Sequence, residues 1–219
     1  RLFETGNLQA TNLVPAKAMV KKPRNFLLVS TDCIYPPVSG SDQRNWALAK
    51  SLSRHGAVTV ASFAQLPADI AAPDGVKLVS FNPDAQVRGK ALRSLRARIE
   101  TRVTAESASR LNEIVTALRP DLTMVSGIPL FGLLDTLAEH GGRVVLDMQN
   151  VESALQRQHA KSLGTIAKLR LKTEALRTAW LENRAAGKVA AITACSRLDR
   201  DHLVSRFRRR LPIHVLPNI

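Results

Sequence analysis

The sequence has little of several features that mark whole classes of protein. It contains two cysteines in 219 residues, Cys33 and Cys195, which follow separate predicted strands. We expect reduced thiols, with a disulfide between them as the less favoured alternative. No apolar run approaches the roughly 18 to 20 residues that cross a bilayer, so no membrane-spanning helix is expected.

Metal and secretion signals are missing as well. The five histidines show no metal-ligand spacing with cysteines or acidic residues, which predicts that there is no metal site. Residues 1–24 are polar and mixed, without the apolar core and small-residue cleavage site of a secretory signal. We expect them to be a poorly ordered leader that precedes one domain over residues 25–219.

Aromatic residues make up 4% of the chain, whereas 32 Lys and Arg against 18 Asp and Glu give a net charge of +14. This charge favours an anionic partner, such as nucleic acid, a phosphorylated ligand or lipid head groups. Proteins that bind single-stranded nucleic acid use aromatic side chains between basic ones, and no such pattern occurs here. We therefore expect no nucleic-acid partner, and a basic nucleic-acid-binding domain is a minority alternative.

What the sequence does contain is an alternation of apolar runs and helical patterns. The predicted strands are Asn25–Ser30, Ala57–Phe63, Val76–Phe81, Asp121–Ser126, Arg143–Met148, Val189–Ala194 and Ile213–Leu216. These runs are almost continuously hydrophobic, as expected when helices cover both faces of a sheet. The pattern predicts an α/β fold, with a Rossmann-like, doubly wound and mostly parallel sheet of six to seven strands.

The predicted helices cover Asp42–Arg54, Gly89–Leu118, Leu130–Glu139 and Glu152–Ala186, and another begins at Ser196. Pro120 disfavours helix in the residue before it and ends the second of them. Gly164 marks a possible break in the fourth. The hydroxyl of Ser196, with Asp199 three residues later, is typical of a capped helix start.

Ligands of open α/β sheets bind outside the carboxyl ends of the strands, so the loops there are the candidate binding segments. No GxGxxG follows the first strand and no GxxxxGK[ST] occurs, which excludes a dinucleotide fingerprint and a P-loop. In the loop Tyr35–Ser41, Gly40 permits close approach of a phosphate to the next helix start. The alternative is a tight turn in which Ser41 or Asp42 only caps the helix.

A second polar loop follows the predicted strand that ends at Met148. Asp147, Gln149, Asn150 and Glu152 could hydrogen-bond a polyhydroxylated ligand. In the structural alternative, Asn150 caps the following helix and Glu152 complements its dipole. Both interpretations can hold together.

These features together resemble the N-terminal domain of a retaining glycosyltransferase of the GT-B fold, family 4. The resemblance runs from Phe26-Leu27-Leu28-Val29-Ser30 through Pro36-Pro37 and the Ser39-Gly40 turn to Arg44, Leu48, Leu52 and His55. It continues in three later segments. These are Asp147–Glu152, which is similar to the family's D-x-H-N-x-E stretch, Thr193-Ala194-Cys195-Ser196 with Asp199, and Leu216-Pro217-Asn218.

Two positions depart from the family pattern. Ser39-Gly40 stands where the family has Gly-Gly, and Gln149 stands where it has His. Glutamine can donate and accept hydrogen bonds but takes no proton at neutral pH, so the family's residue role does not transfer unchanged.

The resemblance implies an acceptor-side domain that works with a C-terminal donor-binding domain outside these 219 residues. It implies Gln149 and Asn150 near the transferring sugar and Ser39 and Gly40 near the donor diphosphate. Supporting or acceptor-side roles fall to Arg44, Asp147, Glu152 and Ser196. No cofactor is implied beyond the nucleotide-sugar substrate, and the fragment alone is expected to be inactive.

A basic helical pattern runs from Arg88 to Val103. Arginines border a narrow apolar stripe there, which suits either an interfacial helix on an anionic membrane or a core-facing helix with a solvated basic back. The resemblance implies an enzyme with a glycan or lipid-linked acceptor, and the reduced thiols favour a cytoplasmic location. If the basic segment is interfacial, this enzyme is also able to associate with a membrane. The alternative is a non-catalytic, acceptor- or membrane-binding module of the same fold.

Overall fold

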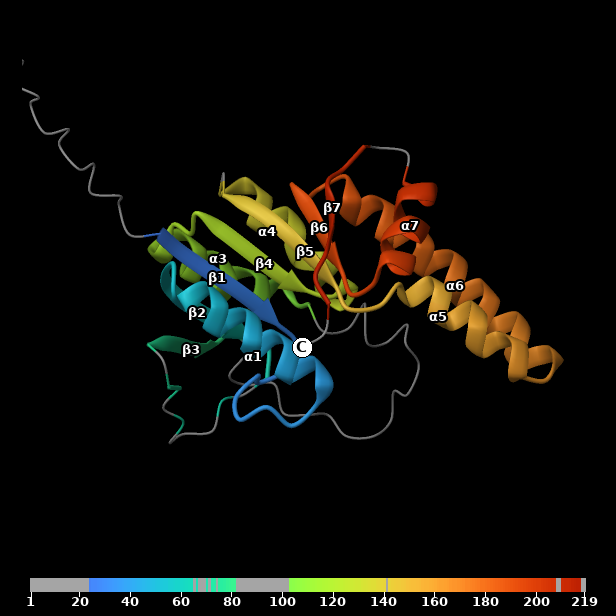
Figure 1. Ribbon diagram of the computed structural model, residues 1–219, viewed down its shortest axis with the longest axis horizontal. Helices are drawn as coiled ribbons and strands as arrows, with labels where there is room; N and C mark the ends of the chain where they lie inside the picture. The colour runs from blue at the N-terminus through green and yellow to red at the C-terminus, as the bar shows by residue number, and fades with distance from the viewer. Residues whose placement is uncertain are drawn as a thin grey trace, which may run out of the picture.

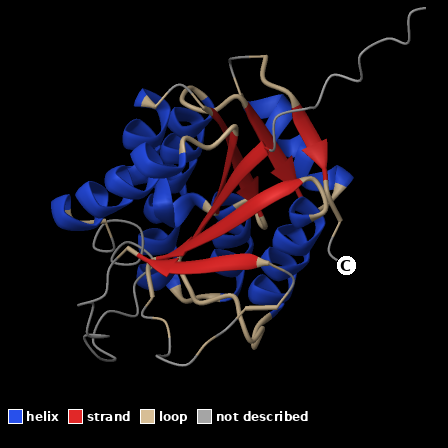
Figure 2. Cartoon of the chain, turned by 90° about the vertical axis from the view of Figure 1, so that its left-hand side faces the viewer, coloured by secondary structure: helices blue, strands red, loops and turns tan. Residues whose placement is uncertain are grey.

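The computed structural model describes residues 24–64, 66, 70, 72–73, 75–81, 103–140, 142–207 and 210–217. In this part of the chain seven strands form one sheet in the order β3-β2-β1-β4-β5-β6-β7, and every neighbouring pair is parallel. The predicted Rossmann-like, doubly wound architecture is therefore confirmed. Figure 2 shows helices on both faces of this sheet.

The strands match the apolar runs to within two residues at either end. They are β1 (Arg24–Ser30), β2 (Gly56–Ser62), β3 (Val76–Ser80), β4 (Leu122–Ser126), β5 (Arg143–Met148), β6 (Ala191–Ala194) and β7 (Ile213–Val215). Their side chains alternate between the two faces because the repeat of a strand is two residues. Leu27 and Val29 lie in one apolar cluster, and Phe26 and Leu28 lie in the other.

Helices complete the two layers. They are α1 (Gly40–Ser53), α3 (Ala105–Leu118), α4 (Leu134–Glu139), α5 (Glu152–His159), α6 (Thr165–Ala186) and α7 (Arg197–Arg206), with the short 3-10 helices η1 (Ile128–Leu133) and η2 (Ala160–Ser162). Helix α1 packs on one face through Ala49, and α3, α4, α6 and α7 contribute to the larger cluster on the other. Helices α5 and α6 pack together as a hairpin (Figure 1).

Three helix predictions need correction or refinement. The continuous helix Gly89–Leu118 is wrong at residues 103–104, because Thr104 is an extended N-cap that exchanges hydrogen bonds with Ser107 at the start of α3. Residues 89–102 lie outside the described part of the chain. The predicted Leu130–Glu139 helix is split between η1 and α4, and the expected break near Gly164 is confirmed, since Gly164 is the N-cap of α6.

The strand order places a topological switch point between β1 and β4. From β1 the chain winds outward to β2 and β3, and it then returns to β4 and continues to β7 on the other side. Loops that leave β1 and β4 diverge at their carboxyl ends, and ligands of open α/β sheets bind in the crevice that results. The residues at these two strand ends are therefore the first place to search for a site.

Candidate functional site

Four segments bring polar side chains to the switch point. Ser30 ends β1, Ser126 ends β4, Gln149 follows β5, and Asn45 comes from α1. The Asn45 Nδ2 donates to Ser126 Oγ (3.0 Å) and to Ser30 Oγ (3.5 Å), while Ser126 Oγ donates to Asn45 Oδ1 (3.1 Å). Asn45 thus joins the two diverging strand ends from within the buried layer.

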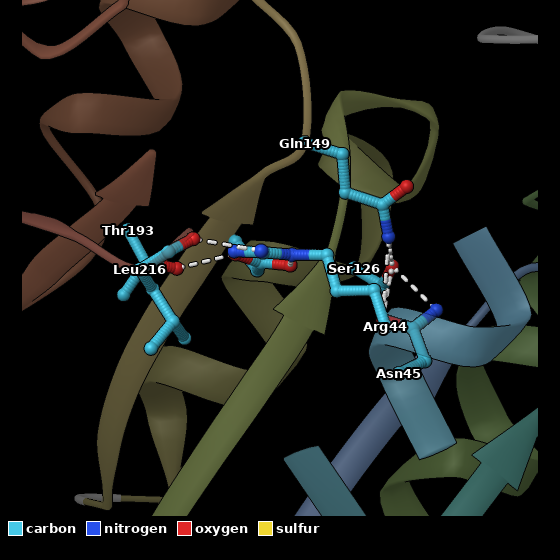
Figure 3. Close-up of polar contacts among 7 residues, drawn as sticks. Arg44, Asn45, Ser126, Gln149, Thr193 and Leu216 are labelled. Carbon is cyan, nitrogen blue, oxygen red and sulfur yellow. Dashed lines mark hydrogen bonds and ion pairs between the residues drawn. The ribbon is translucent and has the colours of Figure 1, made fainter. Parts of the chain in front are cut away.

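Gln149 forms the outer member of this amide cluster. Its Nε2 donates to Ser126 Oγ (3.0 Å) and to Asn45 Oδ1 (3.3 Å), which fixes the plane of its side chain. Its Oε1 accepts no hydrogen bond from the described residues, and Figure 3 shows this oxygen directed away from Asn45 and Ser126. Because Gln149 is half-buried, it can offer this carbonyl oxygen to a bound molecule.

Arg44, the residue before Asn45 on α1, belongs to a second cluster. Its Nε donates to Asp147 Oδ2 (2.9 Å) and its Nη2 to Asp147 Oδ1 (2.7 Å), a two-point pair that is almost fully buried. Its Nη1 donates to the Leu216 carbonyl oxygen (2.7 Å), and Thr193 Oγ1 donates to Asp147 Oδ1 (2.5 Å). Figure 3 shows the guanidinium extending toward Thr193 and Leu216.

The Arg44–Asp147 pair sets the electrostatics at this edge of the sheet. The hydrogen bond to Asp147 raises the pKa of Arg44 above its usual value, and this outweighs the opposite effect of burial. Burial also raises the pKa of the half-buried Cys195 thiol, while the nearby Arg44 partly opposes that rise. The raised pKa disfavours the thiolate, which is the nucleophilic form of cysteine, at Cys195.

The predicted diphosphate loop is a capped helix start. Ser39 is the N-cap of α1, where its hydroxyl accepts from the Asp42 amide (3.2 Å) and Asp42 Oδ2 accepts from the Ser39 amide (2.9 Å). The capping interpretation holds with a correction, because the cap is Ser39 and not Ser41 or Asp42. Gly40 is exposed, and a Cβ built on it meets no atom of the described residues within 4 Å, so these residues leave open space beside it.

The remaining predicted residues lie around the two clusters. Asn150 is exposed and forms no hydrogen bond with the described residues, and the N-cap of α5 is Val151, so the interpretation of Asn150 as a helix cap is wrong. Glu152 lies in the first turn of α5, as the dipole argument expected. Ser196 caps α7, accepting from the Asp199 amide (3.0 Å) and donating to its carboxylate (2.6 Å).

Asp147 has a narrower role than the sequence left open. It is fully buried, and both carboxylate oxygens are occupied by Arg44 and Thr193, so it supports the site and cannot contact a ligand directly. Asn45 and Ser126 were not predicted as site residues, although Asn45 follows Arg44 and Ser126 ends a predicted strand. The one signal at Ser126 is a polar side chain at the end of an apolar run.

Three further expectations concern a metal site, the basic segment 88–103 and membrane-spanning helices. Among the described residues, no group of three or more His, Cys, Asp or Glu side chains could hold a metal ion. The basic segment 88–103 lies outside the described residues except for Val103. Within the described ranges, no helix is long and apolar enough to span a bilayer.

Similarities to known proteins identify the family and the fold of this chain. A family model described as "Glycosyl transferase 4-like domain" matches residues 39–219, which is more than half of the chain and includes every residue of the two polar clusters except Ser30. No curated protein matches this chain in sequence.

Several solved structures share its fold. Sucrose-phosphate synthase from Thermosynechococcus elongatus superposes with a TM-score of 0.66 at 10% identity, covering 89% of this chain and 48% of that one. UGT71G1 of Medicago truncatula, complexed with UDP-glucose, gives 0.53 at 11% identity, with 90% and 52% covered. A UDP-glucosyltransferase from Polygonum tinctorium gives 0.54 at 12% identity, again with 90% and 52% covered.

The chain spans about half the length of each of these structures, and the shared half is a Rossmann-like half of the GT-B fold. Because the sequence identities are low, the structural similarity supports the fold alone, while the family model supports membership of the family. With seven parallel strands, a polar switch point and a family match over residues 39–219, the chain belongs to the glycosyl transferase 4-like domain family.

Proposed function

We propose that this chain is the N-terminal, acceptor-side half of a retaining glycosyltransferase, which moves a sugar from a nucleotide-sugar donor to a glycan or lipid-linked acceptor. A second domain, outside these 219 residues, would hold most of the nucleotide. Family membership and the position of the polar residues at the switch point support this function.

One observation carries the proposal most directly. The Gln149 amide is held by Asn45 and Ser126 at the carboxyl ends of β4 and β5, and its oxygen remains available. A fixed hydrogen-bond acceptor next to an exposed amide, that of Asn150, suits the recognition of sugar hydroxyl groups. Glutamine does not exchange protons at neutral pH, so its contribution is to bind and orient the transferring sugar.

The departing diphosphate requires stabilisation of its negative charge. We assign this task in part to the start of α1, where Ser39 and Gly40 lie at the positive end of the helix dipole. Supporting roles around the site then fall to Arg44, Asp147, Glu152 and Ser196. We propose no metal ion and no cofactor, and a nucleotide-sugar as the donor substrate.

The first experiment replaces Gln149 in the protein that carries both this domain and its donor-binding half. We expect Gln149→Ala to lower kcat/KM for sugar transfer by about 100-fold, the usual effect of losing one oriented hydrogen-bonding group in an active site. Gln43→Ala is the matched control, since it removes an exposed amide from α1. Equal activity of the Gln149→Ala variant and the control would place the transferring sugar elsewhere.

Gly40 allows a second test that is almost free of folding effects. Because a Cβ at this position meets no atom of the described residues within 4 Å, Gly40→Ala should fold normally. If the donor diphosphate lies against this backbone, the same methyl group should raise the donor KM about tenfold or more. Gly164→Ala is the control, because a Cβ there also meets no atom and α6 starts away from the switch point.

A non-catalytic binding module is the second candidate function. The presence of Gln149, where the resembling family has His, favours it. It predicts that the complete protein neither transfers nor hydrolyses sugar from any of the common nucleotide-sugars, yet still binds glycan acceptors in a calorimetric titration. Turnover with one donor, lost in the Gln149→Ala variant, would exclude this module.

A further inference from the structure

Helix α6 has a second apolar face that no other described element covers. Ile166, Leu169, Leu176 and Trp180 are 75%, 68%, 66% and 54% exposed. Thr173, also exposed, lies among them, and within the described residues its hydroxyl bonds only to its own helix, at the Leu169 carbonyl. We call these five residues the α6 stripe. Large apolar side chains are exposed singly on most proteins, whereas a row of them on one helix marks an interaction surface.

The spacing of the α6 stripe makes it continuous. Its members follow one another at intervals of three or four residues, which repeats along one side of a helix. At about 100° per residue they fall within an arc of about 80°. The helix is 22 residues long, so the stripe forms a narrow apolar band along most of it.

The opposite side of α6 already belongs to the core of the domain. Ala175, Thr178, Glu182 and Ala185 are buried there. The Glu182 carboxylate accepts hydrogen bonds from Ser153 of α5 (Oγ, 2.6 Å) and from Arg206 of α7 (Nη2, 2.7 Å), which ties three helices together. Because this face is fixed, α6 cannot turn its stripe inward.

The overall arrangement leaves the stripe accessible. Figure 1 shows the α5–α6 hairpin extending beyond the sheet, away from β1 and β3. Leu163, at the turn that begins α6, is 40% exposed and adds to the apolar surface at that end. The stripe and Leu163 are therefore both exposed on the hairpin.

Basic side chains border the stripe on both sides. Arg170 and Arg184 lie along one edge and Lys172 along the other, and all three are exposed. The guanidinium of Arg184 stacks over the Trp180 ring, 4.8 Å from its centroid. Residues 152–186 contain seven Lys and Arg against three Glu, a net charge of +4, and one of these acids is the buried Glu182.

This charge pattern distinguishes among possible partners. In a pair of identical helices, the residues beside the apolar seam face each other, and here they would be Arg and Lys on both copies. Such like charges oppose self-association through α6. An apolar band edged by cations instead matches a surface with acyl chains below and negative head groups above.

We propose that the α6 stripe docks this domain on an anionic lipid bilayer, with α6 lying in the plane of the interface. Leu169, Leu176 and the neighbouring apolar side chains enter the acyl boundary, Trp180 lies at head-group level, and the flanking cations contact lipid phosphates. This inference goes beyond the proposed sugar transfer, because binding to vesicles needs neither donor nor acceptor.

The test compares this chain and its variants in co-sedimentation with vesicles of equal parts phosphatidylglycerol and phosphatidylcholine. We expect Leu169→Glu/Leu176→Glu to weaken binding at least tenfold. The matched control Leu198→Glu/Val204→Glu adds the same charges at exposed apolar positions of α7 and should change binding much less. Equal losses in both variants, or no loss in the α6 variant, would overturn the proposal.

The lipid charge gives a second comparison. Replacing Arg170 and Lys172 by Gln should weaken binding about fivefold for each charge removed, since one basic residue near an anionic surface contributes that much. Lys77→Gln/Arg210→Gln removes two exposed charges outside the hairpin and should have a smaller effect. Equal binding to pure phosphatidylcholine vesicles would contradict the anionic part of the proposal.

Fluorescence reports the docking site without disturbing it. The chain has two tryptophans, and Trp46→Phe leaves Trp180 as the only one. Anionic vesicles should shift its emission to shorter wavelength and protect it from acrylamide. Vesicle binding without either change would assign the membrane contact to another segment, such as 88–103. A dimer that forms without lipid and is dissociated by Leu169→Glu/Leu176→Glu would assign the stripe to contact with a second copy of the chain. Either result would overturn the proposal, while transfer assays on Gln149 variants would be unaffected.

Discussion

Arg44 and Asn45 are neighbours on α1, and each anchors a polar cluster at the same edge of the sheet. The Arg44 cluster is closed, because every oxygen of Asp147 has a donor and the pair is shielded from solvent. The Asn45 cluster is open on one side, where the Gln149 oxygen accepts nothing from the described residues. Two adjacent residues thus have different roles. Arg44 stabilises the framework of the fold, whereas Asn45 orients a side chain that can bind a ligand.

The largest effect should come from breaking the closed cluster. Asp147→Ala leaves the Arg44 guanidinium buried without its carboxylate, and losing one partner of a buried ion pair costs about 3 to 5 kcal/mol. Urea denaturation of the wild type and the variant measures this difference in free energy of unfolding. A loss below about 1 kcal/mol would mean that water reaches the pair.

The double variant Arg44→Met/Asp147→Leu shows whether the cost comes from the unpaired charge. Replacing both ions by apolar side chains of similar volume is often neutral or stabilising, so this variant should be more stable than Asp147→Ala. If the double variant is the less stable of the two, the bonds to Thr193 and Leu216 carry the stabilisation instead.

Asn45→Ala should have an intermediate effect. It removes partners from the buried hydroxyls of Ser30 and Ser126, and an unsatisfied buried polar group costs about 1 to 3 kcal/mol. Gln43→Ala, on the exposed side of the same helix, is the control and should leave the unfolding free energy nearly unchanged. A similar result for both variants would show that the cluster does not stabilise the fold.

Gln149→Ala should destabilise the domain by less than about 1 kcal/mol, because the side chain is half-buried and water can replace its bonds. The same substitution is expected to impair sugar transfer strongly. This separation of stability from activity is the clearest mark of an open cluster. A loss of several kcal/mol on unfolding would make Gln149 a structural residue.

The smallest effect concerns Cys195. Its raised pKa means that less thiolate is present at pH 8 than in an ordinary cysteine, so iodoacetamide should label Cys195 more slowly than a short cysteine peptide. The protonated thiol makes its full contribution to the free energy of unfolding below the pKa of cysteine in the unfolded chain, about 8.5. This contribution is lost as the pH rises through the higher pKa of Cys195 in the folded chain. Mass spectrometry of the labelled chain between pH 7 and pH 10 measures the rate. Labelling as fast as the peptide would contradict a raised pKa.

The strands could be predicted closely because each one is an apolar run that is buried by helices on both faces of the sheet. Such a run can be recognised in the sequence without knowing which strands lie beside it. Helix ends were predicted less well. Ser39, Ser41 and Asp42 are all suitable caps by composition, and only the path of the loop decides that Ser39 is used. Asn150 looked like a cap for the same reason, yet the chain turns into α5 one residue later.

The candidate site divides in a similar way. Gln149 and Asp147 were found because they follow a predicted strand and resemble a family motif. Asn45 and Ser126 were not found, because they are separated by 81 residues and meet only when β1 and β4 are neighbours. The α6 stripe was not predicted for another reason. Helix α6 has two apolar sides, and its sequence alone does not indicate which of them is buried in the fold.

Local sequence patterns were enough to predict the parallel α/β layers, the strand ends at which polar residues gather and the family to which the chain belongs. These features depend on local pattern and on the burial of apolar runs. The tertiary structure alone decided that Arg44 and Asp147 close one cluster, that Asn45 and Ser126 hold Gln149 in the other, and that the α6 stripe is exposed. Each of these depends on which segments the strand order brings together, and no local pattern in the chain records that order.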